Sequence, residues 1–242
     1  MSVGVNYMRE HVKEDTRIHY VITSGGGQPN VVPPLAEVWY YLRADKHSDV
    51  EAYFEWLNEI ARAAAAMSRT ELQSVQVDAD MHEVLPNRTL SEILQRNLEL
   101  VGAPRFTDEE KEFAAKTQAD LQRKPEKALS EEVEPLPDEP DQGMASTDVG
   151  DISWFVPVGQ LAVASYTYGA PGHSWQIVAC TGTSIGDKAM LVAAKSLAGA
   201  AVDLYASPEL VRKAKADFDG IRAPLQFVTL IPEGQKAPKN VR

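Results

Sequence analysis

Residues 17–43 read R-I-H-Y-V-I-T-S-G-G-G-Q-P-N-V-V-P-P-L-A-E-V-W-Y-Y-L-R. Two segments of this stretch, 17–23 and 36–43, are rich in β-branched and aromatic residues, which is typical of strands. A connection rich in glycine and proline separates them and has the length of a long hairpin loop. We therefore predict two neighbouring strands joined by a shaped turn.

The glycine run in this connection does not match a nucleotide-binding motif. A P-loop requires a lysine after its last glycine, and the Rossmann spacing G-x-G-x-x-G is absent as well. Pro29, Pro33 and Pro34 also lack the backbone N–H groups that a phosphate cradle uses. Asn30 is the side chain of the turn that offers both a donor and an acceptor, and taken alone it fits a turn-stabilising role.

The surrounding residues predict one α/β domain. Val3, Tyr7, Met8 and Val12 share a helical face, residues 49–66 form a strongly periodic helix with Ser48 or Asp49 as its cap, and residues 72–79 alternate as a third strand. The order is helix, strand, strand, helix, strand. One more strand before Met1 would complete a β-α-β-β-α-β arrangement, so we predict a partial ferredoxin-like (split βαβ) domain over residues 1–80.

The remainder, 81–242, has a different character. Amphipathic or apolar periodicity predicts helices at 90–100, 107–121, 187–205 and 209–218, and apolar runs predict strands at 161–166 and 225–230. Residues 123–142 hold four prolines and much of the negative charge. We expect an exposed loop there, with an acidic partner-binding segment as the alternative.

Composition excludes several classes of function. The 242-residue chain carries a net charge of −11, which disfavours nucleic acid and anionic membranes as partners. Its 44% hydrophobic content is enough for a packed core, and no window reaches the roughly 20 apolar residues of a membrane span. Cys180 is the one cysteine and lies in an apolar run, which predicts a small buried side chain. Together with the absence of a targeting segment, this predicts a cytoplasmic protein.

Two further motifs offer candidate site residues. None of the five histidines shows a local metal-ligand spacing, but His173 lies in G-A-P-G-H-S-W-Q, between turn residues where a sheet presents functional loops. The motif S-T-D-V-G-D at 146–151 carries two carboxylates. Asp148 or Thr147 could cap a helix there, or a carboxylate of the motif could orient a histidine or a metal, and the pattern alone does not decide.

Four strings together resemble the aminoacylase/carboxypeptidase family of two-metal amidohydrolases: residues 17–33, 36–43, 146–154 and 171–179. The resemblance runs over nearly the whole chain. It implies a lid or dimerisation domain within residues 1–80, followed by the C-terminal half of an α/β metallopeptidase catalytic domain over 81–242. It implies hydrolysis of the amide bond of N-acyl amino acids such as p-aminobenzoyl-glutamate, with a divalent metal, zinc or manganese, as cofactor.

Carried onto this sequence, the resemblance makes His173 a metal ligand and Asn30 and Arg43 substrate-binding residues of the lid. Asp148 matches an acidic position near the family's site. A guanidinium can hold a carboxylate with two charge-assisted bonds, and an amide can donate to a developing oxyanion. The implied partners are a small-molecule substrate and a second chain, in a homo- or hetero-oligomer formed through the lid.

The family's other metal ligands and its general base precede the lid, and this chain contains no counterpart of that segment. The adjacent glutamates Glu109-Glu110 and Glu131-Glu132 are interpreted as solvated surface residues. We therefore expect the chain alone to be inactive. The alternative to an enzyme portion is a non-catalytic relic or dimerisation module; a small-molecule binding protein that uses Asn30 and Arg43 without metal is a third possibility.

Overall fold

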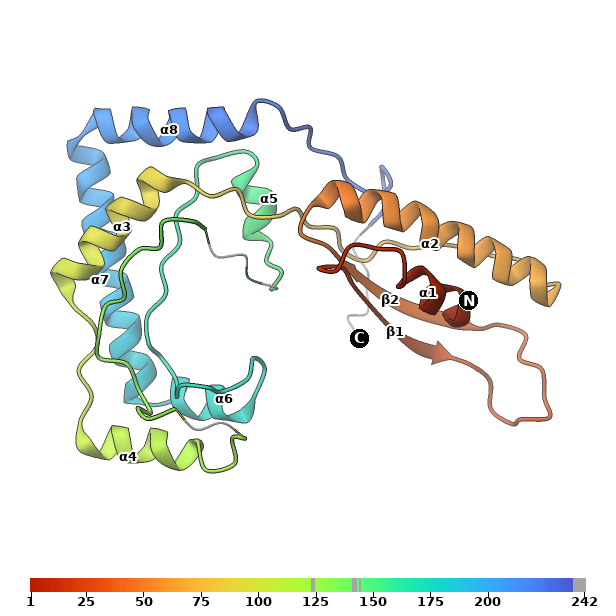
Figure 1. The fold of residues 1–242 in the computed structure, drawn as a ribbon, viewed down its shortest axis with the longest axis horizontal. Helices are drawn as coiled ribbons and strands as arrows, with labels where there is room; N and C mark the ends of the chain where they lie inside the picture. The colour runs from red at the N-terminus through yellow and green to blue at the C-terminus, as the bar shows by residue number, and fades with distance from the viewer. Residues whose placement is uncertain (123–124, 141–142, 144, 237–242) are drawn as a thin grey trace. The chain divides into compact units, whose positions relative to one another are not determined.

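The computed structural model describes residues 1–122, 125–140, 143 and 145–236. These residues form two compact units. Unit 1 consists of Met1–Val84 with the described residues of 142–154 and 226–236, and unit 2 of the described residues of 85–141 with Phe155–Leu225. The elements of unit 1 are α1 (Ser2–Met8), β1 (Arg17–Ser24), β2 (Glu37–Arg43), α2 (His47–Ser68) and α5 (Val149–Ser153). The elements of unit 2 are α3 (Arg88–Val101), α4 (Asp108–Thr117), α6 (Trp175–Thr181), α7 (Ser184–Ala206) and α8 (Pro208–Arg222) (Figure 1).

Unit 1 is built on the predicted hairpin. β1 and β2 pair antiparallel, with Ile18 opposite Leu42 and Tyr20 opposite Tyr40, so the hairpin prediction is confirmed. α1 and α2 pack on the face of the hairpin that carries these side chains, around a buried core. The core residues are Val5, Met8, Ile18 and Leu57, with Met1, Val12, Tyr40, Leu42, Tyr53, Trp56 and Ile60 packed against them.

The other face of the hairpin carries an aromatic surface. Because side chains alternate along a strand, Trp39, Tyr41 and Arg43 share the face opposite Tyr40 and Leu42. Trp39 and Tyr41 meet edge to face with ring centroids 5.2 Å apart, and the Arg43 guanidinium lies 5.7 Å from the centre of the Tyr41 ring. Arg43 is thus half-exposed beside the Tyr41 ring rather than buried in the core.

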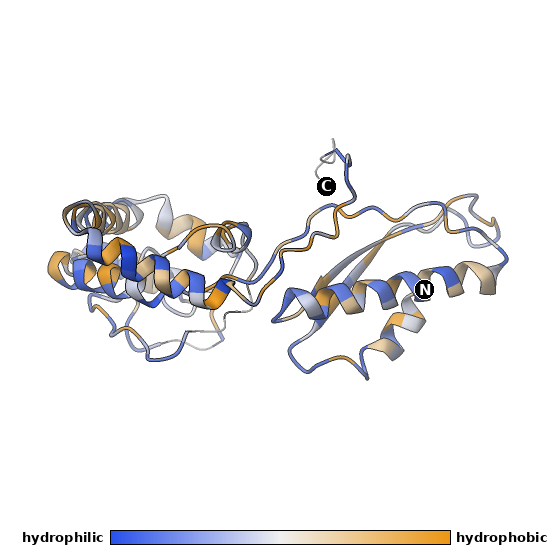
Figure 2. Cartoon of the chain, turned by 90° about the horizontal axis from the view of Figure 1, so that it is seen from above, coloured by the Kyte–Doolittle hydropathy of each residue, from blue (hydrophilic) through white to orange (hydrophobic). Residues whose placement is uncertain are grey.

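α2 begins at His47, two residues before the predicted start. Its N-cap position is Lys46, so the expected cap by Ser48 or Asp49 is wrong. The Glu83 carboxylate accepts a hydrogen bond of 3.1 Å from the His47 backbone N–H instead. A residue 36 positions away therefore satisfies one of the free N–H groups of the first turn. Figure 2 shows hydrophilic and hydrophobic residues mixed along α2, as expected for a helix with one face on the core.

Three predicted strands are absent from the described residues. Segments 72–79, 161–166 and 225–230 are irregular, so these strand predictions are wrong for the chain as described. An apolar segment becomes a strand only when another strand satisfies its backbone groups, and β1 and β2 pair with each other. The split ferredoxin-like lid and the domain boundary at residue 80 stay predictions.

In unit 2, α3 packs on α7 and α8 around Ile93, Leu94 and Ala200. All four helices predicted here are present, with bounds shifted by a few residues. α7 is long and apolar enough to cross a membrane by length and composition, which corrects the expectation that no such segment exists. Core helices of soluble proteins have the same properties, and α7 contacts α3, α6 and α8 of the same unit.

α4 begins with a capping box formed by Thr107 and Glu110. The Thr107 hydroxyl accepts from the Glu110 N–H, and the Glu110 carboxylate accepts from the Thr107 N–H. Glu110 was expected to be solvated, but its side chain is 11% exposed and accepts bonds of 2.6 Å from both Ser184 and Lys188. Burial opposes its charge, yet these bonds outweigh burial and lower the pKa of Glu110 to about 2. Glu110 is therefore an ionised anchor between α4 and α7.

The predicted loop at 123–142 is irregular over 125–140, while residues 123–124 and 141–142 lie outside the described residues. Leu129 is buried in a second core of unit 2 with Phe106 and Ile185. Cys180 is free and fully buried, as predicted.

α3 and α7 approach each other closely at Gly199. A Cβ atom on Gly199 would lie 2.1 Å from Oδ1 of Asn97, a buried residue whose amide donates to the Ile93 carbonyl and to Asp203. These two bonds hold the Asn97 side chain in place. The sequence signal for this contact is a glycine within the apolar second half of α7.

We predict that Gly199→Ala destabilises the protein although alanine favours a helix over glycine by about 1 kcal/mol. The added methyl group must displace Asn97, at a cost of about 1–3 kcal/mol. Gly220→Ala in α8 is the matched control, because no described atom lies within 4 Å of the corresponding position, and it should stabilise by about 0.5–1 kcal/mol. Urea unfolding followed by circular dichroism measures both; equal stabilisation by both substitutions would contradict the close packing.

Candidate functional site

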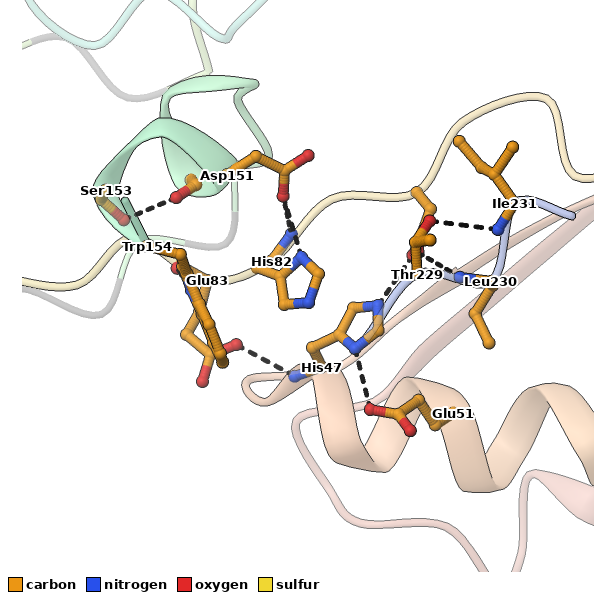
Figure 3. Close-up of polar contacts among 12 residues, drawn as sticks. His47, Glu51, His82, Glu83, Asp151, Ser153, Trp154, Thr229, Leu230 and Ile231 are labelled. Carbon is orange, nitrogen blue, oxygen red and sulfur yellow. Dashed lines mark hydrogen bonds and ion pairs between the residues drawn. The ribbon is translucent and has the colours of Figure 1, made fainter. Parts of the chain in front are cut away.

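Four segments of unit 1 that are distant in sequence meet around two buried histidines (Figure 3). His47 opens α2, Asp80 and His82 lie on the irregular segment after α2, Asp151 belongs to α5, and Phe227 lies in the 226–236 segment. The two histidines are 4% and 5% exposed. We call these five residues the histidine cluster.

His47 is held between two carboxylates. Its Nδ1 lies 3.0 Å from Glu51 Oε1 and its Nε2 lies 2.8 Å from Asp80 Oδ1. An ionised carboxylate only accepts, so both ring nitrogens donate, and that is the arrangement of an imidazolium. Burial disfavours this charge, but the bonds and charges of Asp80 and Glu51 outweigh burial and raise the pKa of His47 above its usual value.

Asp80 links the charged His47 side chain to the 226–236 segment. Its side chain is 4% exposed, and its Oδ2 accepts from the Leu230 N–H at 2.7 Å and from the Thr229 hydroxyl at 3.3 Å. Burial favours the protonated form, but the bonds from His47 and Leu230 outweigh it and lower the pKa of Asp80. One ionised carboxylate therefore fixes two parts of the chain about 150 residues apart.

His82 is oriented by Asp151. The Asp151 carboxylate accepts from both the backbone N–H and Nδ1 of His82, each at 2.9 Å. The Nε2 atom of His82 is buried, and no described group forms a hydrogen bond with it. A ring with Nδ1 donating leaves Nε2 as an acceptor with its lone pair free.

The two imidazoles are stacked. The His47 and His82 ring centroids lie 3.8 Å apart with 14° between the planes, and Phe227 stacks on His82 at 4.2 Å. Two positive charges at 3.8 Å would repel by about 4 kcal/mol at an effective dielectric constant of about 20. The stack therefore favours a single charge, which Asp80 and Glu51 hold on His47.

A glycine allows α5 to reach the cluster. A Cβ atom on Gly150 would lie 2.0 Å from the His82 carbonyl oxygen, so only glycine fits. Trp154, at the end of α5, donates from its indole N–H to the Glu83 carbonyl at 2.9 Å and lies against the His82 ring. The motif S-T-D-V-G-D thus places a carboxylate and a close backbone approach next to His82.

The second carboxylate of this motif, Asp151, orients a histidine. Asp148, the predicted support residue, is exposed at the N-cap of α5, and no cap hydrogen bond to its side chain is described. Thr147 accepts from the Val149 N–H at 3.3 Å, so the capping interpretation applies to Thr147. A side-chain cap by Asp148 is therefore wrong for the described residues, whereas an active-site role for a carboxylate of this motif stays a prediction.

The hairpin does not bring Asn30 and Arg43 together. Asn30 lies in the exposed loop beyond the ends of the two strands, whereas Arg43 is opposite Arg17 at the other end (Figure 1). The advance from Glu37 to Arg43 along β2 spans about 20 Å at the usual rise per strand residue. One copy of the chain therefore does not place both side chains on the same small group.

His173 lies in unit 2, exposed in a turn just before α6. Its φ of 59° is in the left-handed region, which non-glycine residues seldom occupy and where histidine is enriched relative to most others. Such a conformation is held by its surroundings and is common at functional sites.

The described residues include no group of three or more His, Cys, Asp or Glu side chains that could hold a metal ion. The divalent-metal site that the family resemblance implies stays a prediction. The histidine cluster does not substitute for it, because three of the four imidazole nitrogens are already bonded to carboxylates.

His47 and His82 were not predicted as site residues, because they lack a local ligand spacing in the sequence. The available signal was the string D-A-D-M-H-E at 78–83, where acidic residues and a histidine follow an apolar helix. The partners of His82 come from α5 and the 226–236 segment, and only the folded chain shows them.

Three curated proteins, one hydrolase subunit and two dipeptidases, are similar in sequence to this chain. It is 34% identical over 258 aligned residues to the B subunit of p-aminobenzoyl-glutamate hydrolase from Escherichia coli (strain K12), covering 96% of this chain and 53% of that protein. It is 26% identical to the Xaa-Arg dipeptidase of Homo sapiens (94% and 46% covered) and 24% identical to that of Mus musculus (89% and 43%). No family model matches. The chain spans about half the length of these relatives.

The raised pKa of His47 and the lowered pKa of Asp80 predict how stability depends on pH. The His47 contribution is complete below the unfolded value of 6.5 and is lost as pH rises through the raised folded pKa. The Asp80 contribution is present above its unfolded value of 3.8 and is lost as pH falls through the lowered folded pKa. The free energy of unfolding should therefore be largest between about pH 4 and 6.5, and should fall on the alkaline side as pH rises through the raised pKa of His47.

His47→Gln should remove this alkaline decrease, while His19→Gln on the exposed side of β1 should retain it. Urea unfolding followed by tryptophan fluorescence at a series of pH values provides the measurement. If wild type and His47→Gln lose stability equally as pH rises, the imidazolium assignment is wrong.

Gly150→Ala should separate α5 from His82, because the new methyl group has no space beside the His82 carbonyl. We expect a loss of about 1–3 kcal/mol in the free energy of unfolding and a change in Trp154 fluorescence. Gly27→Ala is the control, since no described atom lies within 4 Å of its corresponding position. Unchanged fluorescence and stability in Gly150→Ala would rule out the close approach.

Proposed function

We propose that this chain is the C-terminal portion of a metal-dependent amidohydrolase. The p-aminobenzoyl-glutamate hydrolase B subunit and the Xaa-Arg dipeptidases are its relatives, which confirms the resemblance seen in its motifs. Its substrate class is N-acyl amino acids such as p-aminobenzoyl-glutamate. The observation that carries the proposal is 34% identity over 96% of the chain to a protein that hydrolyses this compound by name.

In this proposal His173 supplies one metal ligand. Its side chain is exposed, and its left-handed backbone is of the kind that is common at functional sites. The remaining ligands and the general base belong to the part of the relatives' length that this chain does not span. We expect zinc or manganese, since both accept histidine and carboxylate ligands.

Asn30 and Arg43 have the exposure that substrate-binding residues need. Arg43 lies beside Tyr41 on an open face and can grip a carboxylate with two charge-assisted bonds. Asn30 lies in an exposed loop and can donate to a carbonyl oxygen. Because Asn30 lies beyond the end of the hairpin opposite Arg43, and β2 alone spans about 20 Å, we propose that they serve different substrate molecules, in an oligomer formed through the lid.

A second candidate is a non-catalytic relic or dimerisation module. The observation that favours it is that the described residues contain no group of three metal-ligating side chains. The two candidates differ in one property: an enzyme portion becomes active when the missing ligands are supplied, and a module does not.

The test uses a hybrid in which this 242-residue chain replaces the matching 53% of the Escherichia coli protein. We expect the chain alone to release no p-aminobenzoate, and the hybrid to release it in a reaction that a chelator stops and zinc or manganese restores. In the hybrid, His173→Ala should lower metal content and reduce turnover by more than the roughly 100-fold typical of residues that only orient ligands.

His19→Ala, another exposed histidine, is the matched control and should leave metal content and turnover unchanged. Robust metal-dependent hydrolysis by the isolated chain would contradict the proposal that the remaining metal ligands and the general base lie outside it. An inactive hybrid that binds metal stoichiometrically would favour the non-catalytic module.

A further inference from the structure

The face of the hairpin opposite the unit 1 core carries a guanidinium with free donors. Arg43 ends β2 and is half-exposed, and its described contact is the Tyr41 ring, 5.7 Å away. None of the described residues accepts a hydrogen bond from Arg43 or forms an ion pair with it. A guanidinium has five N–H donors in a fixed fork and is always charged in proteins. Arg43 can therefore bind an anion without first breaking a contact to a carboxylate of the described chain.

A second arginine lies directly across the hairpin. Arg17 on β1 is opposite Arg43, so both side chains belong to the same face. Arg17 donates to the backbone carbonyls of Glu14 and Thr16 at 2.6 and 2.8 Å, and no described carboxylate pairs with it. Like charges directly opposite each other destabilise a strand pair. The chain has 35 acidic but only 24 basic residues, so this positive pair without a counter-ion indicates that an anion binds beside it.

Two aromatic rings continue the same face along β2. Tyr41 and Trp39 precede Arg43 by two and four residues, and side chains at this spacing share a face of a strand. The ring centroids lie 5.2 Å apart with 68° between the planes, and Tyr41 is 51% exposed. Such an edge-to-face contact orients the two rings relative to each other. We call Trp39, Tyr41 and Arg43 the β2 surface; it combines a stacking site with a cation.

The spacing of the β2 surface matches an aromatic ring joined to a carboxylate through an amide. Alternate positions of a strand are about 7 Å apart. In p-aminobenzoyl-glutamate, which the Escherichia coli relative hydrolyses by name, about 6 Å separates the ring centre from the α-carboxylate at ordinary bond lengths. A ligand whose carboxylate is bound by Arg43 therefore has its ring beside Tyr41, with Trp39 at the far side of the ring.

We propose that the β2 surface selects the acyl group of the substrate: Trp39 and Tyr41 bind the ring of an N-aroyl amino acid whose carboxylate Arg43 holds. This inference rests on the proposed function, which assigns Arg43 to a carboxylate. Its new content is that Trp39 and Tyr41 determine specificity, and that the substrate class is the N-aroyl glutamates rather than N-acyl amino acids in general.

Charge separates the two kinds of substrate that the relatives' names specify. An N-aroyl glutamate is an aromatic dianion, whereas an Xaa-Arg dipeptide carries a guanidinium of its own. Arg43 and Arg17 attract the glutamate side chain and repel the arginine side chain. A small aliphatic acyl group would leave Trp39 and Tyr41 in water and would lose the stacking contribution. The β2 surface thus favours a ligand that is both aromatic and anionic.

NMR titration of the isolated chain with three probes tests the inference. Benzoyl-glutamate should bind roughly tenfold more tightly than acetyl-glutamate, because only the former stacks on the rings, and more tightly than benzoyl-arginine. Trp39→Leu and Tyr41→Leu should each weaken benzoyl-glutamate and leave acetyl-glutamate unchanged. Arg43→Gln should weaken both glutamate probes alike, by roughly tenfold. A variant that merely lost structure would bind every probe less well, so the selective loss identifies a contact with the ring.

Matched controls lie elsewhere in unit 1. Tyr7→Leu, at a 70% exposed position on α1, and Arg62→Gln, at an exposed position on α2, should leave all three affinities unchanged. Trp39→Phe keeps an aromatic ring and should retain most of the preference for benzoyl-glutamate. A wild-type chain without this preference, or a preference that survives Trp39→Leu and Tyr41→Leu combined, would overturn the inference. Dimerisation that covers Trp39 and that Trp39→Leu abolishes would assign the surface to a second copy and also overturn it.

The hybrid with the Escherichia coli segment separates this inference from the proposed function. In the hybrid, the ratio of kcat/KM for benzoyl-glutamate to kcat/KM for acetyl-glutamate should fall roughly tenfold in Trp39→Leu and stay unchanged in Tyr7→Leu. An inactive hybrid, with the isolated chain still selecting benzoyl-glutamate through Trp39 and Tyr41, refutes the proposed function alone. An active hybrid whose ratio is the same in wild type, Trp39→Leu and Tyr41→Leu refutes this inference alone.

Discussion

Unit 1 depends on a buried positive charge that must remain paired. His47 is nearly inaccessible to solvent, and its charge is stable there only because Asp80 and Glu51 accept from both ring nitrogens. Asp80 is ionised for the same reason and uses its second oxygen to hold the backbone at Leu230. The start of α2, the segment after it and the 226–236 segment are therefore fixed by one charge and its two counter-ions. Loss of either partner would leave an uncompensated charge in a low-dielectric environment, which costs more than the pair contributes.

The same cluster explains why part of the fold could be predicted from sequence and part could not. The hairpin of β1 and β2 and the helices α1, α2, α3, α4, α7 and α8 follow from residues close together in the chain, and their predictions are confirmed, whereas α5 and α6 were not predicted. The start of α2 depends on Glu83, and the orientation of His82 depends on Asp151, 69 residues away. Such partners leave no periodic signal. Only the glycine at position 150 indicated that two backbones approach there, and a lone glycine serves equally often in turns and helix caps.

The failed strand predictions have a different cause. Segments 72–79, 161–166 and 225–230 have the composition of strands, but a strand also needs a neighbour for its N–H and C=O groups. Composition reports the environment for which a segment is suited, and the described residues provide no neighbouring strand at these three places. In the same way, the sequence of α7 reports a helix suited to burial on both sides, whereas unit 2 covers one side. The disagreement between local composition and local structure thus carries information about missing contacts.

The candidate site residues fall into two groups, those paired within the chain and those accessible to solvent. The histidine cluster is satisfied internally, apart from Nε2 of His82, since its charges and donors are matched by residues of unit 1. His173, Asn30 and Arg43 are exposed or half-exposed, and His173 is held in a backbone conformation that costs free energy. A strained, accessible histidine with no metal-ligating group around it in the described chain is difficult to explain by stability alone. Residues that stabilise this chain are thus paired within it, whereas those that the family resemblance assigns to catalysis are open to ligands that the described residues do not supply.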